Sequence, residues 1–313
     1  MRRASASRSS TTWRAGSRTS RDTTRWRCTD VTTQPEGAIA PVAVGPDGIP
    51  EYRIEGAWSL PVKGPAIPPI DPELLAAFDE VSSATASAKL HQMGITRTFI
   101  EGPRPLKAGR HIVGRAVTLQ FMPMREDIYS DAGVTQEYVE RATALWAVLD
   151  FIEPGDVLVA QAYGSLRSGV VGEMLAHHLH NRGGVGLVVD GGVRDSGRLA
   201  GIDLPIWANG ATPHYASQGT LLPWGYHVPV AVGGALVLPG DLIVADDDGA
   251  VVVPIAKAWE LVESSRHHEA WEDFSRAKLA QGGALRRYYP LDDVGLSEYE
   301  AWESAGRPAI GEA

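Results

Sequence analysis

Hydrophobic positions follow a helical spacing in the first half of the chain and a strand-like spacing in the second half. Asp71 and Pro72 predict a helix start, because aspartate caps helices and proline suits the first helical position. Apolar residues continue at helical intervals to Val81, and residues 82–93 extend the pattern. A strand is predicted over 114–120. A second amphipathic helix is predicted over 135–151, with one apolar face formed by Tyr138, Ala142, Leu145, Trp146 and Leu149.

From Asp156 onward, glycine and proline separate short apolar runs that are typical of buried strands. These predicted strands cover residues 156–160, 185–189, 206–208, 228–232, 241–245 and 250–254. A helix that ends at Arg182-Gly183-Gly184 lies among them, and a C-terminal helix over 255–281 follows them. Because only one strong helix interrupts the strands, we expect a mixed β/α layered core and not a doubly wound βαβ repeat.

Both ends of the chain differ from this core in composition. Residues 1–35 carry eight arginines and many serines and threonines, which cannot bury enough apolar surface to fold, so we expect a disordered extension. The alternatives are an organelle transit peptide and a basic arm for anionic partners. Residues 36–70 read as a proline- and glycine-rich arm, 71–285 as the main domain and 286–313 as a polar C-terminal tail.

Overall composition is that of an ordinary globular protein, with 44% hydrophobic and 21% charged residues. A net charge of −9 argues against general nucleic-acid binding, which needs a basic surface. The single cysteine, Cys28, excludes an intrachain disulfide and a cysteine metal box, and it fits a reducing compartment. No apolar run approaches the roughly 18 residues of a spanning helix, so we expect a soluble, cytoplasmic protein without membrane contact.

Three charged residues are spaced so that folding brings them to one rim. Glu173 stands at the start of a predicted helix, and Arg194 and Asp195 follow the next strand, with twenty residues between Glu173 and Arg194. The intervening Asp190-Gly191-Gly192 predicts a sharp turn, because glycine tolerates positive φ. A carboxylate, a guanidinium and a second carboxylate together outline a site.

These residue types suit chemistry on a small oxo acid. Asp195 can hold a hard divalent cation, and the planar fork of Arg194 matches the carboxylate of an α-keto acid. The N–H groups of Met174 and Leu175, at the helix start, are placed to receive a developing oxyanion. The alternative is a structural Arg–Asp contact that anchors a turn.

Other polar groups are weaker candidates. Gly164–Gly169 lacks the spacing of a phosphate loop and reads as a flexible loop at the edge of the site. His177, His178 and His180 on one helix, like His267-His268-Glu269 further on, favour surface or interface positions over a zinc site. Asp246–Gly249 favours a hairpin turn over a calcium loop. No G-x-S-x-G elbow supports a serine hydrolase.

Several segments together resemble one known family over residues of about 105 to 285. They are Pro154–Val159, Gly172-Glu173, Val188–Asp195, Leu204–Ile206, Val228–Val230, Gly233-Gly234, Pro239–Asp241 and Asp246–Pro254. In their order and spacing they resemble the family of the RNase E regulator RraA and the class II 4-hydroxy-4-methyl-2-oxoglutarate / 4-carboxy-4-hydroxy-2-oxoadipate aldolases.

The resemblance implies an α/β fold with a layered β/β/α sandwich core of the RraA-like, swivelling-domain type, assembled as homotrimers or homohexamers with sites at subunit interfaces. It implies that Asp195 ligates Mg²⁺ or Mn²⁺, and that Arg194, Gly172 and the amides of Met174 and Leu175 bind the substrate. Glu173 takes the place of an aspartate in the aldolases, which moves its charge by one methylene. A glutamate from a neighbouring subunit, Glu269 or Glu272, is also implied.

We therefore expect a metal-dependent lyase that cleaves a 4-hydroxy-2-oxo acid to pyruvate and an oxo compound, with oxaloacetate decarboxylation as a side activity. One alternative is a non-catalytic RraA-like regulator that binds a protein such as a ribonuclease. Another is a lyase with a different substrate. The segment Phe121–Asp127 then serves an altered substrate pocket or, as we favour, interface packing.

Overall fold

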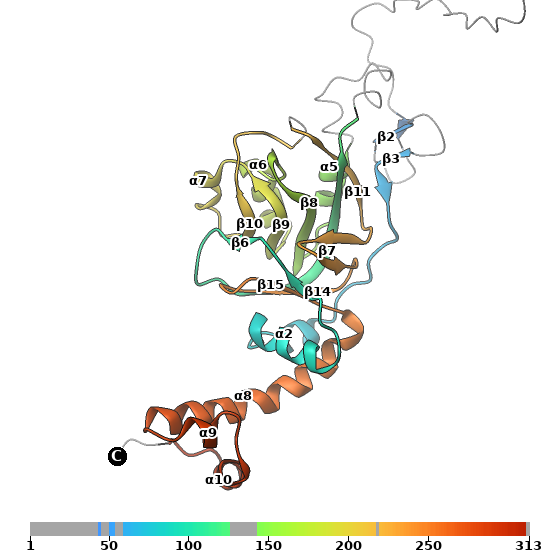
Figure 1. Cartoon of the computed structure of the whole chain (residues 1–313). Helices are drawn as coiled ribbons and strands as arrows, with labels where there is room; N and C mark the ends of the chain where they lie inside the picture. The colour runs from blue at the N-terminus through green and yellow to red at the C-terminus, as the bar shows by residue number, and fades with distance from the viewer. Residues whose placement is uncertain (1–42, 45–49, 54–58, 126–142, 217–218, 311–313) are drawn as a thin grey trace, which may run out of the picture. The chain divides into compact units, whose positions relative to one another are not determined.

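The core is a large sheet built around one long strand, β7 (Ile112–Pro123), in the computed structural model (Figure 1). The structure describes residues 43–44, 50–53, 59–125, 143–216 and 219–310. The first part of β7 pairs antiparallel with β14 (Leu242–Ala245), and its last part pairs antiparallel with β11 (Leu221–Tyr226). Its other edge pairs parallel with β8 (Asp156–Gly169). One strand thus joins the two antiparallel parts of the sheet to its parallel part.

The parallel part runs β7-β8-β9-β10, with β9 at Gly186–Val193 and β10 at Ile206–Ala211. Helices lie between successive strands in sequence, namely α5 (Ala144–Asp150), α6 (Glu173–Asn181) and α7 (Ser196–Leu199). Only one strong helix was expected among the strands, so this series of parallel strands with helical connections was not predicted. The predicted helix over 135–151 survives as α5 within the described residues, and 135–142 lies outside them.

Shorter strands complete the sheet and its surroundings. The sheet also includes β4 (Val62–Lys63), β5 (Phe99–Ile100), β6 (Arg104–Pro105) and β15 (Ala250–Val253). A hairpin of β12 (Val230–Val232) and β13 (Ala235–Val237) stands apart, as does a small sheet of β1 (Ala43–Val44), β2 (Pro50–Arg53) and β3 (Ser59–Leu60).

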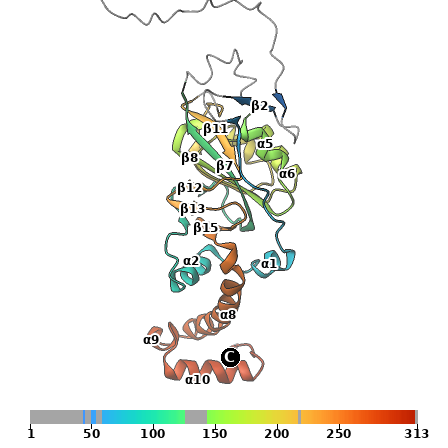
Figure 2. The same ribbon diagram turned by 90° about the vertical axis from the view of Figure 1, so that its right-hand side faces the viewer.

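Alternate residues of the central strands face two different cores. Leu158 and Ala160 of β8 pack with α5 and α6, whereas Val157 and Val159 pack with the β12–β13 hairpin. Figure 2 shows α5 and α6 on one side of β7 and β8 and the β12–β13 hairpin on the other. This alternation is the two-residue period of a strand covered on both faces. The expected layered β/β/α arrangement in the α/β class is confirmed.

The first helices follow their capping residues. Helix α1 (Pro72–Ala77) begins after Asp71, whose Oδ1 accepts the N–H of Glu73 at 2.9 Å, as predicted. The pattern does not continue as one helix, because Ser82 caps a separate helix, α2 (Ser83–Gln92). Ser82 Oγ accepts the N–H of Thr85 at 3.1 Å, so a second capping residue interrupts the apolar spacing.

The C-terminal part of the chain is more structured than a polar tail. After the short 3₁₀ turn η1 (Ile255–Lys257), helix α8 (Ala258–Ala280) packs against α1 and α2. Helices α9 (Leu285–Tyr288) and α10 (Asp293–Ser304) then pack on the far end of α8 around a cluster of Phe274, Tyr288, Tyr299 and Trp302. Aromatic residues separated by irregular intervals form this cluster, and helical periodicity does not reveal it.

Two predictions near the site are wrong for the same reason. Asp190-Gly191-Gly192 does not turn, because β9 continues through these residues to Val193. Gly164–Gly169 is not a loop, because it forms the end of β8, where Ser165 and Gly169 pair with Gly191 and Gly192. Pairing between β8 and β9 holds both segments in the sheet, with shifts of register between Ala160 and Gly169. The Asp246–Gly249 hairpin turn between β14 and β15 is confirmed.

Candidate active site

The candidate site lies where β9 ends beside the start of α6. The N–H of Val170 donates to Gly192 O at 2.9 Å, and the N–H of Arg194 donates to Val171 O at 2.9 Å. These bonds hold the segment before α6 against the end of β9. Gly172 is the N-cap of α6 and adjoins Arg194 and Asp195. The structure thus brings together the residues that the sequence placed at one rim.

Asp195 adopts a left-handed backbone conformation, with φ +61° and ψ +37°, directly after β9. Aspartate is one of the few residues that tolerate this conformation. Its Oδ2 accepts hydrogen bonds from Arg194 Nε at 3.2 Å and from the N–H of Glu173 at 3.4 Å. The expected turn therefore occurs at Asp195, and it presents the carboxylate to the start of α6.

Close packing around Gly172 explains why a glycine stands before Glu173 at the start of α6. A Cβ built on this residue would lie 2.8 Å from Asp195 Oδ2 and 3.4 Å from Arg194 Nε. Its φ of −112° and ψ of −176° are open to any residue, so space and not backbone conformation requires glycine here.

The start of α6 offers backbone donors next to this carboxylate. Ala176 donates back to Gly172 O at 3.0 Å, and the N–H groups of Met174 and Leu175 precede that first helical bond. Such N–H groups, together with the helix dipole, favour an anion. The predicted role of Met174 and Leu175 as amide donors is consistent with their position.

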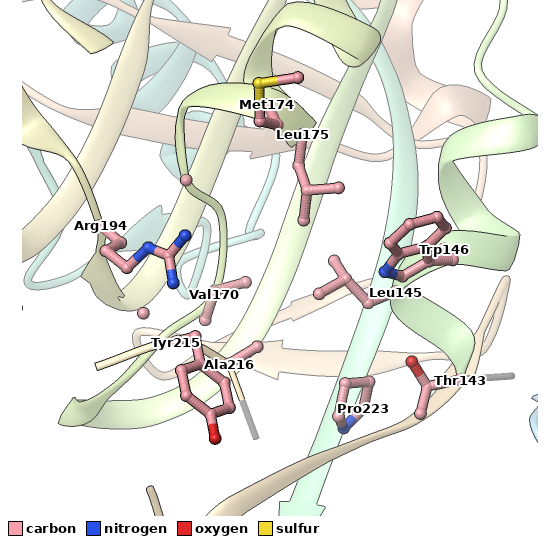
Figure 3. Close-up of a pocket in the computed structure, with 12 residues that line it drawn as sticks. Thr143, Leu145, Trp146, Val170, Met174, Leu175, Arg194, Tyr215, Ala216 and Pro223 are labelled. Atoms are coloured by element: carbon pink, nitrogen blue, oxygen red, sulfur yellow. The ribbon is translucent and has the colours of Figure 1, made fainter. Parts of the chain in front are cut away.

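A pocket of about 190 Å³ opens beside Arg194. It is lined by residues of α5, α6, the segment before α6 and β11, among them Leu145, Trp146, Gly172, Leu175 and Pro223. Figure 3 shows Arg194 on one side of the pocket and Trp146 on the opposite side, with Leu175 and Leu145 between them. This volume is below the roughly 300 Å³ of the smallest drug-sized sites, so it suits a small metabolite.

A second, more open cavity of about 450 Å³ lies on the other side of the same dipeptide. Asp195, Arg198 and Thr212 are among its lining residues. Arg194 lines the first cavity and Asp195 the second, so the two side chains stand at the boundary between them.

Glu173 pairs with Arg198, a residue that was not expected in the site from the sequence. Its Oε2 accepts a bond from Arg198 Nη1 at 2.8 Å, and this contact raises the pKa of Arg198. The carboxylate is three-quarters buried, and Glu173 is not among the residues that line the pocket beside Arg194. Sequence reasoning missed Arg198, because its approach to Glu173 depends on α7 packing against α6.

Trp146 is a second residue whose role the sequence did not reveal. It was placed on the apolar face of a helix, yet its side chain is 45% exposed while Leu145 and Ala147 beside it are buried. Because Trp146 also lines the pocket beside Arg194, its exposed indole offers an apolar surface to a ligand there.

The donor set fits a cation that keeps most of its water. Within the parts of the chain that the structure describes, no three or more His, Cys, Asp or Glu side chains gather as a metal site. The Asp195 side chain is one-third exposed and its described hydrogen bonds reach a single oxygen. Mg²⁺ is commonly held by one or two carboxylates and several waters, and Asp195 alone can supply that contact.

The other predicted groups lie elsewhere. His178 Nε2 is 3.7 Å from Asp150 Oδ1 on the outside of α6. Helix α8, which carries Glu269 and Glu272, packs against α1 and α2, and Glu272 does not line either cavity. The side chains of His267, His268 and Glu269 lie outside the described residues. None of the helices in the described ranges is long and apolar enough to cross a bilayer.

The chain belongs to the RraA-like family, because residues 78–252, more than half of its length, match the family model described as Aldolase/RraA. The family expected from the sequence motifs is confirmed.

Among named relatives, the protein DlpA of Legionella pneumophila is 26% identical over 221 residues, which cover 69% of this chain and 33% of DlpA. A Halalkalibacterium halodurans protein named "Putative 4-hydroxy-4-methyl-2-oxoglutarate aldolase" is 32% identical over 137 residues, which cover 43% of this chain and 64% of that protein. The chain thus spans one third to just under two thirds of the length of these relatives.

Two solved structures are similar over most of their own length. RraAS2 of Streptomyces coelicolor, described as an unusual member of the RNase ES inhibitor RraA protein family, is 54% identical with a TM-score of 0.61, covering 68% of this chain and 99% of that one. An uncharacterized protein of Pseudomonas syringae pv. tomato is 25% identical with a TM-score of 0.59, covering 71% and 98%.

Proposed function

We propose that the chain is a divalent-metal-dependent lyase that cleaves a 4-hydroxy-2-oxo acid to pyruvate and an oxo compound. The observation that carries the proposal is the Arg194 guanidinium at a small pocket beside the start of α6, with Asp195 held next to it. The named aldolase relative and the family model support the reaction class.

Each group at the rim has a part in this chemistry. Arg194 binds the substrate carboxylate, which a planar guanidinium can engage through two parallel hydrogen bonds. The N–H groups of Met174 and Leu175 donate to the oxygen of the 2-oxo group, where negative charge develops. Asp195 would hold Mg²⁺ or Mn²⁺, which as a Lewis acid polarises that same carbonyl.

The reaction then needs a proton acceptor. The C3–C4 bond breaks, its electron pair remains on C3 as the pyruvate enolate, and the 4-hydroxyl proton leaves as the second oxo compound forms. C3 is protonated afterwards to give pyruvate. We assign Glu173, whose N–H donates to Asp195 Oδ2 at 3.4 Å, as the carboxylate that accepts the hydroxyl proton through a bridging water, because it adjoins the pocket without lining it. Oxaloacetate decarboxylation passes through the same enolate and is the expected side activity.

The test is pyruvate release from 4-hydroxy-4-methyl-2-oxoglutarate and from oxaloacetate, with Mg²⁺ or Mn²⁺ and then with EDTA. We expect metal-dependent release that Asp195→Ala abolishes, while calorimetry shows weaker metal binding by the variant. If folded, metal-loaded protein releases pyruvate neither from these dicarboxylates nor from a 4-hydroxy-2-oxo acid with a single carboxylate, the proposal is refuted.

A regulator of a ribonuclease is the second candidate function. The observation that favours it is the 54% identity to a protein described as a member of the RNase ES inhibitor family. Adding the purified chain to a ribonuclease E cleavage reaction separates the two functions. Inhibition that Asp195→Ala leaves intact would assign a regulatory surface outside the lyase site.

Assembly into a homotrimer or homohexamer is part of the lyase proposal, with Glu269 or Glu272 of one copy reaching the site of the next. Light scattering on the purified chain measures the assembly. If the chain is a monomer that turns over substrate, this part of the proposal fails while the lyase stands.

A further inference from the structure

Charge is distributed unevenly around the pocket beside Arg194. Of its described lining residues, Arg194 alone carries a charged side chain. It can pair with one carboxylate. A carboxylate at the other end of the same substrate would lose water inside the pocket, where none of the described lining residues offers a second cation. Removing an unpaired charge from water raises the free energy of binding.

The side of the pocket opposite Arg194 is apolar. Leu145 and Trp146 reach it from α5, and Leu175 reaches it from α6 (Figure 3). Leu145 is buried, whereas Trp146 leaves 45% of its surface exposed at the pocket. A ligand whose carboxylate lies at Arg194 directs its other end toward this wall, and an apolar group there would remove indole surface from water.

Resting on the proposed lyase function, we propose that this pocket selects oxo acids with a single carboxylate and an apolar tail, and that Trp146 determines this specificity. The preferred substrate class is a 4-hydroxy-2-oxo acid whose C4 carries alkyl groups in place of a second carboxylate. Such a compound differs from 4-hydroxy-4-methyl-2-oxoglutarate at one group only.

The matched substrate is 4-hydroxy-4-methyl-2-oxopentanoate. Its C3–C4 bond breaks with the electron pair left on C3, the 4-hydroxyl proton leaves, and protonation of C3 gives pyruvate, while C4 becomes the carbonyl carbon of acetone. No oxidant, reductant or further reactant is needed. The products therefore differ from those of the dicarboxylate only in the second oxo compound.

Binding can be measured without turnover. The compounds 4-methyl-2-oxopentanoate and 2-oxoglutarate are similar in size, lack the 4-hydroxyl group and cannot undergo this cleavage. Titration calorimetry on the full chain with Mg²⁺ should give a dissociation constant about tenfold lower for 4-methyl-2-oxopentanoate, the ratio expected from burying one or two methyl groups. Equal binding, or tighter binding of 2-oxoglutarate, would overturn the proposal.

Substitutions at position 146 test the role of the indole. Trp146→Ala should bring the ratio of the two dissociation constants near unity, and Trp146→Arg should reverse it in favour of 2-oxoglutarate. Trp259→Ala on α8 is the matched control, because Trp259 is also 45% exposed and lies outside the pocket. A ratio that Trp146→Ala leaves unchanged would contradict the assignment even if the wild-type preference is present.

Failure of this inference can be distinguished from failure of the proposed function. Faster cleavage of the dicarboxylate, which gives two pyruvates per molecule, than of 4-hydroxy-4-methyl-2-oxopentanoate, which gives one pyruvate and acetone, supports the lyase and overturns the inferred specificity. The expected binding preference without pyruvate release from either compound upholds the role of Trp146 and refutes the lyase.

Discussion

The guanidinium Nε of Arg194 donates to Oδ2 of Asp195 at 3.2 Å, so two neighbouring residues brace each other across the boundary of two cavities. Engaging Nε fixes the plane of the guanidinium while its two terminal nitrogens face the pocket (Figure 3). The Arg194–Asp195 contact therefore anchors the turn and also orients the proposed carboxylate-binding group.

Replacing the guanidinium should weaken substrate binding more than it weakens the fold. Arg194→Lys keeps the charge but loses the planar fork, and we expect kcat/KM for pyruvate release to fall roughly 10- to 100-fold, since a hydrogen bond to a charged group contributes about 1.5–3 kcal/mol. Steady-state kinetics and a thermal melt on the same preparation check this. A variant with unchanged kcat/KM would show that Arg194 does not bind the substrate.

Adding one methyl group at the helix start should disturb the site without unfolding it. In Gly172→Ala the new Cβ would meet Asp195 Oδ2 at 2.8 Å, so the carboxylate must move. Misplacement of this kind commonly costs about 10- to 100-fold in rate, and we expect that loss in kcat. Gly197→Ala is the control, because its Cβ would meet nothing within 4 Å. Equal losses in both variants would contradict this explanation.

The buried ion pair of Arg115 and Asp156 should dominate the stability of the N-terminal edge of the parallel strands. Arg115 Nε donates to Asp156 at 2.7 Å and Nη1 donates to Pro68 O at 2.7 Å, which ties the proline-rich arm to the sheet. Asp156→Ala leaves a buried guanidinium without this partner, and we expect a loss of about 3–5 kcal/mol in the free energy of unfolding.

Glu153→Ala is the matched comparison for that measurement. Glu153 bonds the same guanidinium at 2.8 Å but its side chain is 60% exposed, so its loss should cost about 1 kcal/mol or less. Denaturant unfolding of both variants measures the difference. Similar losses would show that burial does not set the strength of these contacts.

His227 should make the stability depend on pH below neutrality. Burial, with smaller effects from Arg115 and Lys63, lowers the pKa of His227 from 6.5 to about 4. Because the unfolded chain then binds the proton more readily, stability is present above about pH 6.5 and is lost as the pH falls toward 4. The full effect is about 3 kcal/mol, of which about 2 kcal/mol is lost by pH 5.

His227→Asn should remove that part of the pH dependence, since asparagine does not titrate and tolerates the φ of +53° at this position. The measurement is the free energy of unfolding at pH 7 and pH 5 for both proteins. The wild type should lose about 2 kcal/mol more than the variant between these values. Parallel pH profiles would contradict a buried neutral imidazole.

Local signals were enough to predict the elements that depend on neighbours in sequence. Asp71 caps α1, Gly183 with φ +90° follows the end of α6, and Asp246–Gly249 closes a hairpin, each through contacts within a few residues. Glu173 and Arg194 likewise lie at the same edge of the sheet, as their spacing predicted, because one helix and one strand separate them.

Long-range contacts explain what the sequence concealed. Asp190 lies inside β9, where its carboxylate accepts the N–H of Ala162 on β8 and, at 3.2 Å, that of Gly233 in the β12–β13 turn. From the sequence alone, an aspartate before two glycines predicts a turn. The N–H donors of Ala162 and Gly233 that hold Asp190 within a strand are distant in sequence and could not be foreseen. In the same way, the approach of α5 to the pocket, and not the pattern of that helix, gives Trp146 its place.

The left-handed conformation of Asp195 also has a consequence for how this family diverges. Asparagine accepts the same backbone conformation and nearly the same volume, and a single-base change in an aspartate codon produces it. Such a change would remove the negative charge of the Asp195 carboxylate, which we propose binds the cation, and would leave the turn and the sheet intact. A catalytic and a non-catalytic member can therefore differ by one substitution. Selection for a stable fold alone would not remove that substitution.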